Sequence, residues 1–136
     1  MNGMRFIPAY VHGILDYLGG ALLLLAPNIF GFADYGGAAV WVPRVLGVAI
    51  LGMALMTRYR VGLVRVIPMQ THLLVDYVAS IFLAVSPFLF GFSDADGNVW
   101  LPHVVAGIGI FLLTLFTETY SDVETDTAQT TMRRAP

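Results

Sequence analysis

The sequence predicts an all-α fold, a four-transmembrane-helix bundle made of two tandem helical hairpins. Composition is the first observation behind this prediction, since 57% of the 136 residues are hydrophobic and only 12% are charged. An ordinary soluble domain carries about twice that charged fraction. A soluble chain of this size could not bury so much apolar surface, because small domains leave much of their surface exposed. We therefore expect lipid to surround most of the chain.

Four apolar stretches are the second observation, at residues 6–26, 40–57, 67–86 and 99–117. Each is close to the ~20 residues with which a helix crosses the hydrocarbon core of a bilayer. None shows the sustained alternation of apolar and polar residues that a membrane β-barrel requires. The stretches therefore predict four membrane-spanning helices.

An internal repeat is the third observation. Residue i matches residue i+60 in both halves of the chain, apart from a one-residue shift in the loop. Matching pairs include Ile7/Ile67, Pro8/Pro68, His12/His72, Asp16/Asp76, Tyr17/Tyr77, Pro27/Pro87, Gly31/Gly91, Gly47/Gly107 and Thr57/Thr117. The repeat predicts one hairpin in residues 1–60 and a second in residues 61–119. Because each hairpin crosses twice, both share one orientation and a pseudo-twofold axis along the membrane normal.

The repeat also argues against a cleaved signal peptide in the first stretch, since a segment copied in mid-chain is not a leader. The prolines indicate where the helices begin and end. Pro8 and Pro68 suit the first turn of spans one and three, where the missing N–H is not needed. Pro43 and Pro102 are expected to do the same for spans two and four, and Pro27 and Pro87 to end spans one and three.

Arginine placement predicts the orientation in the membrane. Arg5 precedes span one, three arginines separate spans two and three, and two lie in the tail. With four crossings these regions share one side, which the positive-inside rule assigns to the cytoplasm. We therefore expect a multi-pass protein of the cell (inner, cytoplasmic) membrane with both termini in the cytoplasm. Residues 120–136 are polar without an apolar period and predict a disordered cytoplasmic tail.

The outer interface is expected to carry aromatic and basic anchors. Trp41 and Trp100 fit the aromatic belt at the membrane surface, as do the Phe-Gly-Phe triplets. Arg44 and His103 occupy the same repeat position after Trp-x-Pro. We interpret them as anchors, with Asp34 and Asp94 as candidate acceptors; the alternative is a contact with an anion or a lipid headgroup. His103 should lie most of a membrane thickness from the other histidines.

The stretch Ser86-Pro87-Phe88, preceded by a His-x3-Asp helix and followed by Trp100-Leu101-Pro102, resembles the SPW-repeat family of small bacterial and archaeal integral membrane proteins. The resemblance covers about residues 6–118. The second copy has Phe88 at the family's tryptophan position, and the first copy keeps only the proline of the motif. The resemblance implies a membrane protein without an assigned biochemical role and supplies no catalytic residues.

The candidate polar cluster consists of His12, Asp16, His72 and Asp76. Residues four apart share one face of a helix, so each histidine lies beside the aspartate of its own span. A charged group facing lipid is costly. Both pairs should therefore face the bundle interior, where pseudo-symmetry can bring all four side chains together.

Three interpretations of this cluster remain open. The favoured one is structural: imidazole N–H groups donate to carboxylates and tie spans one and three together. In the second, the cluster handles protons or lines a conducting cavity, since histidine titrates near neutral pH. In the third, His12 and His72 bind a metal, a haem or a quinone-like ligand.

The sequence thus predicts an integral membrane protein of structural or accessory role, with no catalytic residues, no assignable reaction and no predicted cofactor. It has no cysteine, which excludes disulfides, thiolate metal sites and cysteine nucleophiles. The formal net charge of -2 gives no reason to expect nucleic acid. The expected partners are the lipid bilayer and further copies of the chain or other membrane proteins.

Overall fold

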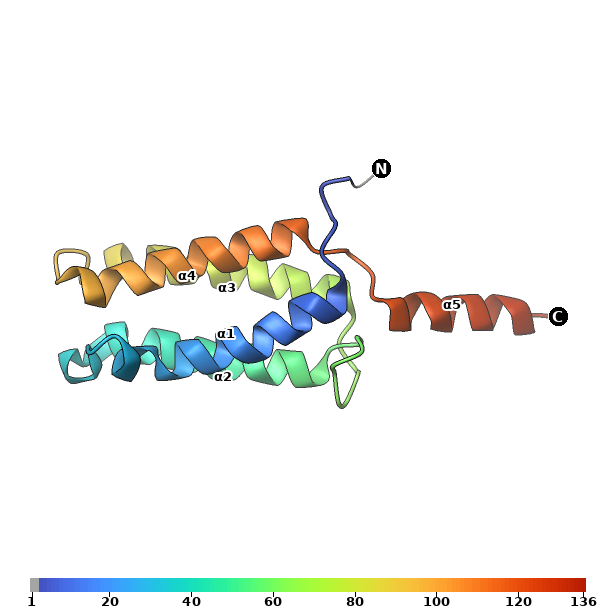
Figure 1. The fold of residues 1–136 in the computed structure, drawn as a ribbon, viewed down its shortest axis with the longest axis horizontal. Coiled ribbons are helices and arrows are strands. Elements are labelled where there is room, and N and C mark those ends of the chain that lie inside the picture. Colours follow the sequence, from blue (N-terminus) through green and yellow to red (C-terminus); the bar gives the residue numbers. More distant parts are fainter. Residues whose placement is uncertain (1–2) are drawn as a thin grey trace.

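The computed structural model describes residues 3–136, and this part of the chain is all-helical (Figure 1). The elements in order are α1 (Ala9–Ile29), the short 3-10 helix η1 (Ala33–Tyr35), α2 (Gly37–Met56), α3 (Met69–Leu89), α4 (Gly97–Phe116) and α5 (Asp122–Arg134). The first four α-helices have 20 or 21 residues each and are apolar enough to cross a membrane. They confirm the predicted four-helix architecture.

The helices form two hairpins, α1 with α2 and α3 with α4, which lie side by side (Figure 1). The α1–α2 and α3–α4 connections lie at one end of the bundle, which we call the loop end. The segments that precede α1 and follow α4, together with the α2–α3 connection, lie at the other end, the terminal end. The predicted pair of tandem hairpins is confirmed.

The two halves are joined at the terminal end by equivalent backbone contacts. The Ile7 N–H donates to the Phe116 carbonyl at 3.0 Å, and the Ile67 N–H donates to the Met56 carbonyl at 2.8 Å. Ile7 forms a bridge with Thr117, and Ile67 forms the equivalent bridge with Thr57. Each entry segment therefore pairs with the end of the other hairpin, as a pseudo-twofold relation requires.

Glycines bring the helices of each hairpin close together. A Cβ on Gly47 of α2 would lie 2.7 Å from the Gly20 carbonyl oxygen of α1. At the equivalent place in the second hairpin, a Cβ on Gly107 would lie 2.6 Å from the Ser80 carbonyl oxygen. Both contacts are too short for any side chain, so the backbones meet there directly.

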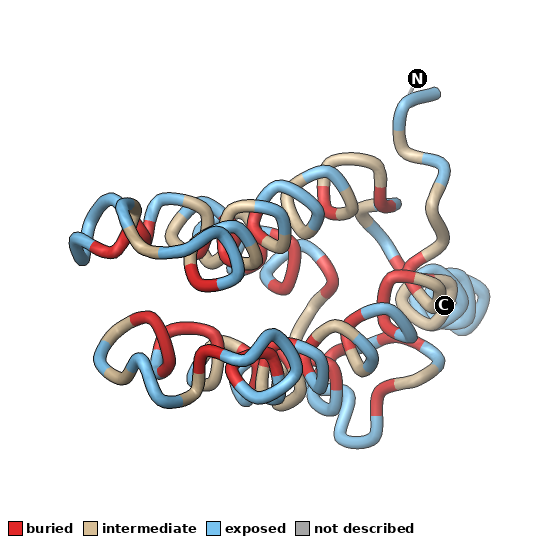
Figure 2. The backbone as a smooth tube through the Cα atoms, turned by 60° about the vertical axis from the view of Figure 1, so that its left-hand side comes forward, coloured by how far each residue is buried: buried red, intermediate tan, exposed pale blue. Residues whose placement is uncertain are grey.

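The outward faces of the helices are apolar and exposed, whereas buried residues gather between the hairpins (Figure 2). On α1, for example, Leu18 is 64% and Leu25 is 52% exposed; on α3, Val78 is 64% exposed. So many exposed apolar side chains need a nonaqueous surrounding. This surface fits the lipid environment that the composition predicts.

The Phe-Gly-Phe triplets end α1 and α3 in the same way. Gly31 and Gly91 have positive φ values of 73° and 74°, and the N–H of the following phenylalanine reaches back to the helix. This is the Schellman arrangement, in which glycine adopts the left-handed conformation just after a helix. Phe32 and Phe92 turn inward from these caps and are 2% and 4% exposed.

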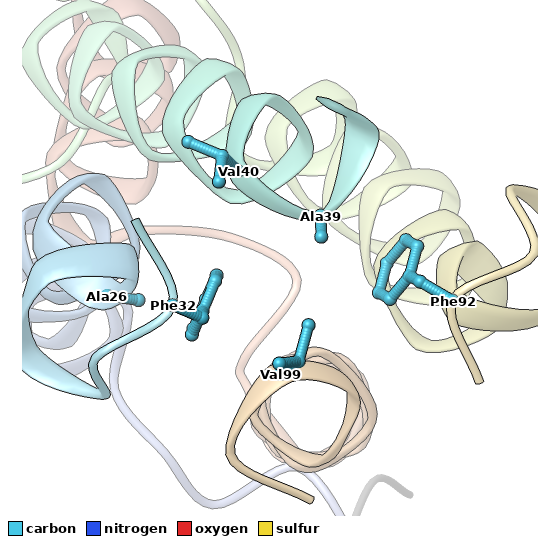
Figure 3. Packing of buried hydrophobic residues seen from close by; sticks show 6 residues of the cluster. All are labelled: Ala26, Phe32, Ala39, Val40, Phe92 and Val99. Atoms are coloured by element: carbon cyan, nitrogen blue, oxygen red, sulfur yellow. The ribbon is translucent and has the colours of Figure 1, made fainter. Parts of the chain in front are cut away.

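The two inward-facing rings contribute to a hydrophobic cluster at the loop end (Figure 3). The cluster consists of Ala26, Phe32, Ala39, Val40, Phe92 and Val99. Within each triplet, only the first phenylalanine, Phe30 or Phe90, is exposed. The expectation that whole triplets face the membrane surface is therefore wrong, because capping turns their second ring into the core.

The predicted helix boundaries at the prolines are also partly wrong. α1 and α3 continue two residues beyond Pro27 and Pro87, and Pro43 and Pro102 lie well inside α2 and α4.

A proline in a helix leaves the carbonyl four residues earlier without its N–H partner. The Ser86 hydroxyl donates to the Leu83 carbonyl at 2.7 Å. His103 Nε2 donates to the Ala39 carbonyl at 2.9 Å. These two side chains thus donate to the carbonyls that Pro87 and Pro43 leave without a backbone N–H partner.

Residues 122–134 form α5 instead of the predicted disordered tail. A capping box starts this helix: the Glu124 N–H donates to the Ser121 hydroxyl, and the Glu124 carboxylate accepts from the Ser121 N–H. The tail is also attached to the bundle. Ser121 Oγ donates to the Arg58 carbonyl, and Glu124 accepts from the Met69 N–H at 3.0 Å.

Candidate functional site

The four candidate side chains meet between the hairpins, in the half of the bundle nearer the terminal end. α1 supplies His12 and Asp16, and α3 supplies His72 and Asp76. Both histidines are 0% exposed, and the aspartates are 6% and 3% exposed. The imidazole centroids lie 5.2 Å apart with nearly perpendicular rings. We refer to these four residues as the quartet.

Each histidine lies between the two carboxylates. His12 Nε2 is 2.9 Å from Asp76 Oδ2 and 3.3 Å from Asp16 Oδ1. His72 Nε2 is 2.9 Å from Asp16 Oδ2 and 3.1 Å from Asp76 Oδ2. The shorter distance in each case is to the aspartate of the other hairpin. Helical spacing thus puts histidine and aspartate on one face, but the nearest contacts run between helices.

Two threonines at equivalent positions of the repeat contact Nδ1, the second nitrogen of each imidazole ring. Thr57 Oγ1 lies 2.6 Å from His72 Nδ1 and donates to the Met53 carbonyl. Thr117 Oγ1 lies 2.8 Å from His12 Nδ1 and donates in the same way to the Leu113 carbonyl. Both threonines are 0% exposed. They directly follow α2 and α4. They match each other in the repeat, but nothing in the sequence pattern assigns them to the site.

Tyr59 is a third residue at the site that the sequence pattern does not indicate. It follows α2 in the α2–α3 connection, is 0% exposed and places its ring centroid 5.8 Å from that of His72. A Cβ on Gly13 would lie 2.6 Å from the tyrosine ring, so this glycine makes room for it. The second hairpin has Thr119 at the equivalent position. The aromatic cover over the quartet therefore comes from one hairpin only.

The predicted interface residues lie at the loop end, away from the quartet. His103 is 1% exposed and lies between Phe32 and Phe92, with centroid distances of 5.6 and 4.9 Å. Arg44 donates to Asn28 Oδ1 at 3.0 Å, not to the aspartates suggested as acceptors. Of the tryptophans, Trp41 is 62% exposed, whereas Trp100 packs against the loop-end cluster.

The quartet has the donor set of a metal centre as well as that of a hydrogen-bonded cluster. One nitrogen from each histidine and one oxygen from each aspartate lie within 4.8 Å of one another. Two imidazoles and two carboxylates suit a divalent transition metal. The same groups can instead hold two protons as imidazolium–carboxylate pairs.

A family model for the SPW repeat domain matches residues 10–117, which include both hairpins and the whole quartet. No curated protein and no solved structure matches the chain.

Proposed function

The chain belongs to the SPW repeat domain family and is a multi-pass membrane protein, and we propose that its role is structural or accessory. In this proposal the quartet is a polar clamp that fixes the two hairpins to each other inside the bilayer. The joined hairpins then present a largely apolar surface that associates with lipid and with other membrane proteins or further copies of the chain.

The observation that carries the proposal is that the shortest quartet contacts join different hairpins. His12 bonds Asp76, His72 lies closest to Asp16, and each histidine reaches a threonine of the opposite hairpin. Lipid is as apolar as the helix surfaces, so the hydrophobic effect contributes little to hairpin association. Buried polar contacts and close packing must supply the specificity instead.

Conduction of protons or solutes finds less support. Toward the loop end, an apolar cluster that includes Leu23, Val42, Ile50 and Leu83 lies between the hairpins, and the cavity of about 400 Å³ between α1 and α4 is lined almost entirely by apolar side chains. The buried hydroxyl of Ser80 donates to a carbonyl of its own helix, as does that of Ser86. Neither group extends the quartet toward the loop end.

We also propose that the terminal end faces the cytoplasm of the cell membrane. Arg5, Arg58, Arg60 and Arg65 all belong to segments at that end. The loop end carries Asp34, Asp94 and Asp96 in its connections. This distribution of arginines supports an orientation with both termini inside.

Replacing Asp16 by Asn tests the clamp. We expect the free energy of unfolding in detergent to fall by more than the roughly 0.6 kcal/mol that one interhelical hydrogen bond contributes on average in a membrane. The upper limit is the loss of about 3–5 kcal/mol seen when one partner of a buried ion pair is removed. The measurement is equilibrium unfolding followed by circular dichroism, and Asp76→Asn should behave alike.

Asp34→Asn is the matched control, because it makes the same chemical change at an exposed aspartate of the loop end. The clamp proposal is wrong if Asp16→Asn and Asp34→Asn have equal stability.

Proton flux into liposomes provides a second readout. A flux that wild-type protein supports and Asp16→Asn abolishes would favour conduction over a structural role.

A further inference from the structure

We propose that the quartet binds one divalent first-row transition-metal ion, with His12 Nε2, His72 Nε2 and one oxygen each of Asp16 and Asp76 as ligands. The inference deepens the structural role proposed above and rests on it, since the ion would be the centre of the clamp. Four features of the site support it: the orientation of the imidazoles, the unpaired nitrogen and oxygen atoms, the distances between ligand atoms and the balance of charge.

The threonines fix which imidazole nitrogen carries hydrogen. Each threonine hydroxyl has one hydrogen, and the backbone carbonyl 2.6 Å away can only accept it. The hydroxyl oxygen is then an acceptor toward the ring, so Nδ1 of His72 and of His12 must be the donor. In a neutral imidazole this leaves Nε2 with a free electron pair, which is the form that binds metals.

Both free electron pairs are surrounded by carboxylate oxygens at 2.9–3.3 Å. Electron pairs facing carboxylates repel, so a positive species must lie between them. Only the His12–Asp76 contact has the geometry of a hydrogen bond among these four pairs. His72 Nε2 and Asp16 Oδ2 are buried without any hydrogen-bond partner, although they lie 2.9 Å apart. With protons on the imidazoles, His72 Nε2 and Asp16 Oδ2 therefore stay without a partner. A metal ion bound to both atoms would provide one.

The distances between ligand atoms fit a tetrahedral ion. Metal–nitrogen and metal–oxygen bonds of about 2.0–2.1 Å place neighbouring ligands about 3.3 Å apart in a tetrahedron. Asp76 Oδ2 lies 2.9 and 3.1 Å from the two Nε2 atoms, and Asp16 Oδ2 lies 2.9 Å from His72 Nε2, which is close to that spacing. No ligand atom of the set is more than 4.8 Å from another. Small side-chain rotations would therefore complete the coordination.

Charge balance favours a divalent ion. Two carboxylates and two neutral imidazoles carry two negative charges, which one divalent cation neutralises. A neutral complex is what a fully buried site in a membrane needs, since an uncompensated charge is costly there. The ligands are nitrogen and oxygen atoms without sulfur, which suits Zn²⁺, Mn²⁺, Fe²⁺ or Co²⁺ better than Cu⁺. The Nδ1–threonine bonds are the outer contacts that orient metal-binding histidines.

Titration with Co²⁺ tests the proposal directly. Full-length protein in detergent is stripped with a chelator and titrated with Co²⁺, whose visible absorption reports a tetrahedral site. We expect saturation at one ion per chain, displacement by Zn²⁺ and release of any protons held on the histidines. Wild-type protein that takes up neither ion stoichiometrically overturns the proposal, whatever the variants do.

The variants locate the site. His12→Ala should abolish stoichiometric binding, whereas His103→Ala, at the loop-end histidine, should leave it unchanged. Thr57→Val removes no ligand but frees the His72 ring, and we expect metal affinity to fall by about 10–100-fold. Circular dichroism checks that each variant is folded. Binding that survives in folded His12→Ala, or that is lost in folded His103→Ala, contradicts the assignment.

The outcomes also separate this inference from the clamp. If no metal binds but Asp16→Asn still destabilises the protein, the clamp is supported and the metal is excluded. If metal binds and raises the melting temperature of wild-type protein but not of His12→Ala, both are supported. If metal binds but the stability of Asp16→Asn equals that of wild-type protein, the site exists and the clamp is wrong.

Discussion

At the scale of single residues, burial decides what each polar group can do. His12 and His72 are each held by a threonine on one side and carboxylates on the other. Beside them, the hydroxyl of Tyr59 is also buried without a hydrogen-bond partner. Burial raises the pKa of Tyr59 above its ordinary value, and the nearby Asp16 carboxylate raises it further. The folded protein therefore keeps this phenol protonated.

The raised pKa of Tyr59 makes stability depend on pH. In the unfolded chain a tyrosine ionises near pH 10, so above that pH the unfolded state binds fewer protons than the folded state. The free energy of unfolding contributed by Tyr59 is therefore complete below about pH 10 and is lost as the pH rises further. We expect Tyr59→Phe to flatten the fall in stability above about pH 10, measured by unfolding across a pH series.

Tyr35→Phe is the matched control for this series, since the same hydroxyl is removed from a side chain that is 54% exposed. It should retain the wild-type pH dependence. At neutral pH, Tyr59→Phe should be at least as stable as wild type, because it removes an unpaired buried hydroxyl. An unchanged slope in Tyr59→Phe would show that the tyrosine does not act in this way.

At the scale of helices, a proline inside a helix explains why a polar side chain lies beside it. Pro87 lies inside α3 and cannot bond the Leu83 carbonyl, which accepts from the Ser86 hydroxyl instead. Serine directly before proline thus restores a hydrogen bond that a membrane helix cannot replace with water. The first repeat has Ala26 before Pro27 and lacks this hydroxyl.

Exchanging these residues tests the role of the serine. Ser86→Ala should lower the free energy of unfolding by about 1 kcal/mol, the usual net contribution of a hydrogen bond. Ala26→Ser should have the opposite effect in the first repeat. Thermal unfolding in detergent measures both, and Ser93→Ala, beyond the end of α3, is the control. Equal stability of Ser86→Ala and Ser93→Ala would contradict this role.

At the scale of the whole molecule, the two ends of the bundle differ in charge and in structure. The terminal end holds the segment before α1, the arginine-rich α2–α3 connection and α5. Arg60 of that connection pairs with Asp122 of α5. The loop end contains the capped ends of α1 and α3 and the loop-end cluster, whose Phe32 and Phe92 lie on either side of His103.

Cysteine labelling tests the proposed orientation, and the chain offers a clean background because it has no cysteine. In intact cells, a membrane-impermeant maleimide should label Asp94→Cys at the loop end. Thr130→Cys in α5 should react only after the membrane is opened. The reverse pattern would place the terminal end outside and contradict the arginine rule for this protein.

The sequence by itself determined the four helices, their grouping into hairpins and the presence of histidine and aspartate on one face of α1 and of α3. Apolar length, the 60-residue repeat and helical spacing are local properties that can be read without coordinates. Only the tertiary structure decided that His12 bonds Asp76, that Thr57 and Thr117 orient the rings, and that Tyr59 covers them. These contacts join residues up to 105 positions apart. They depend on how each helix is rotated, which a helix that is apolar on most sides does not specify.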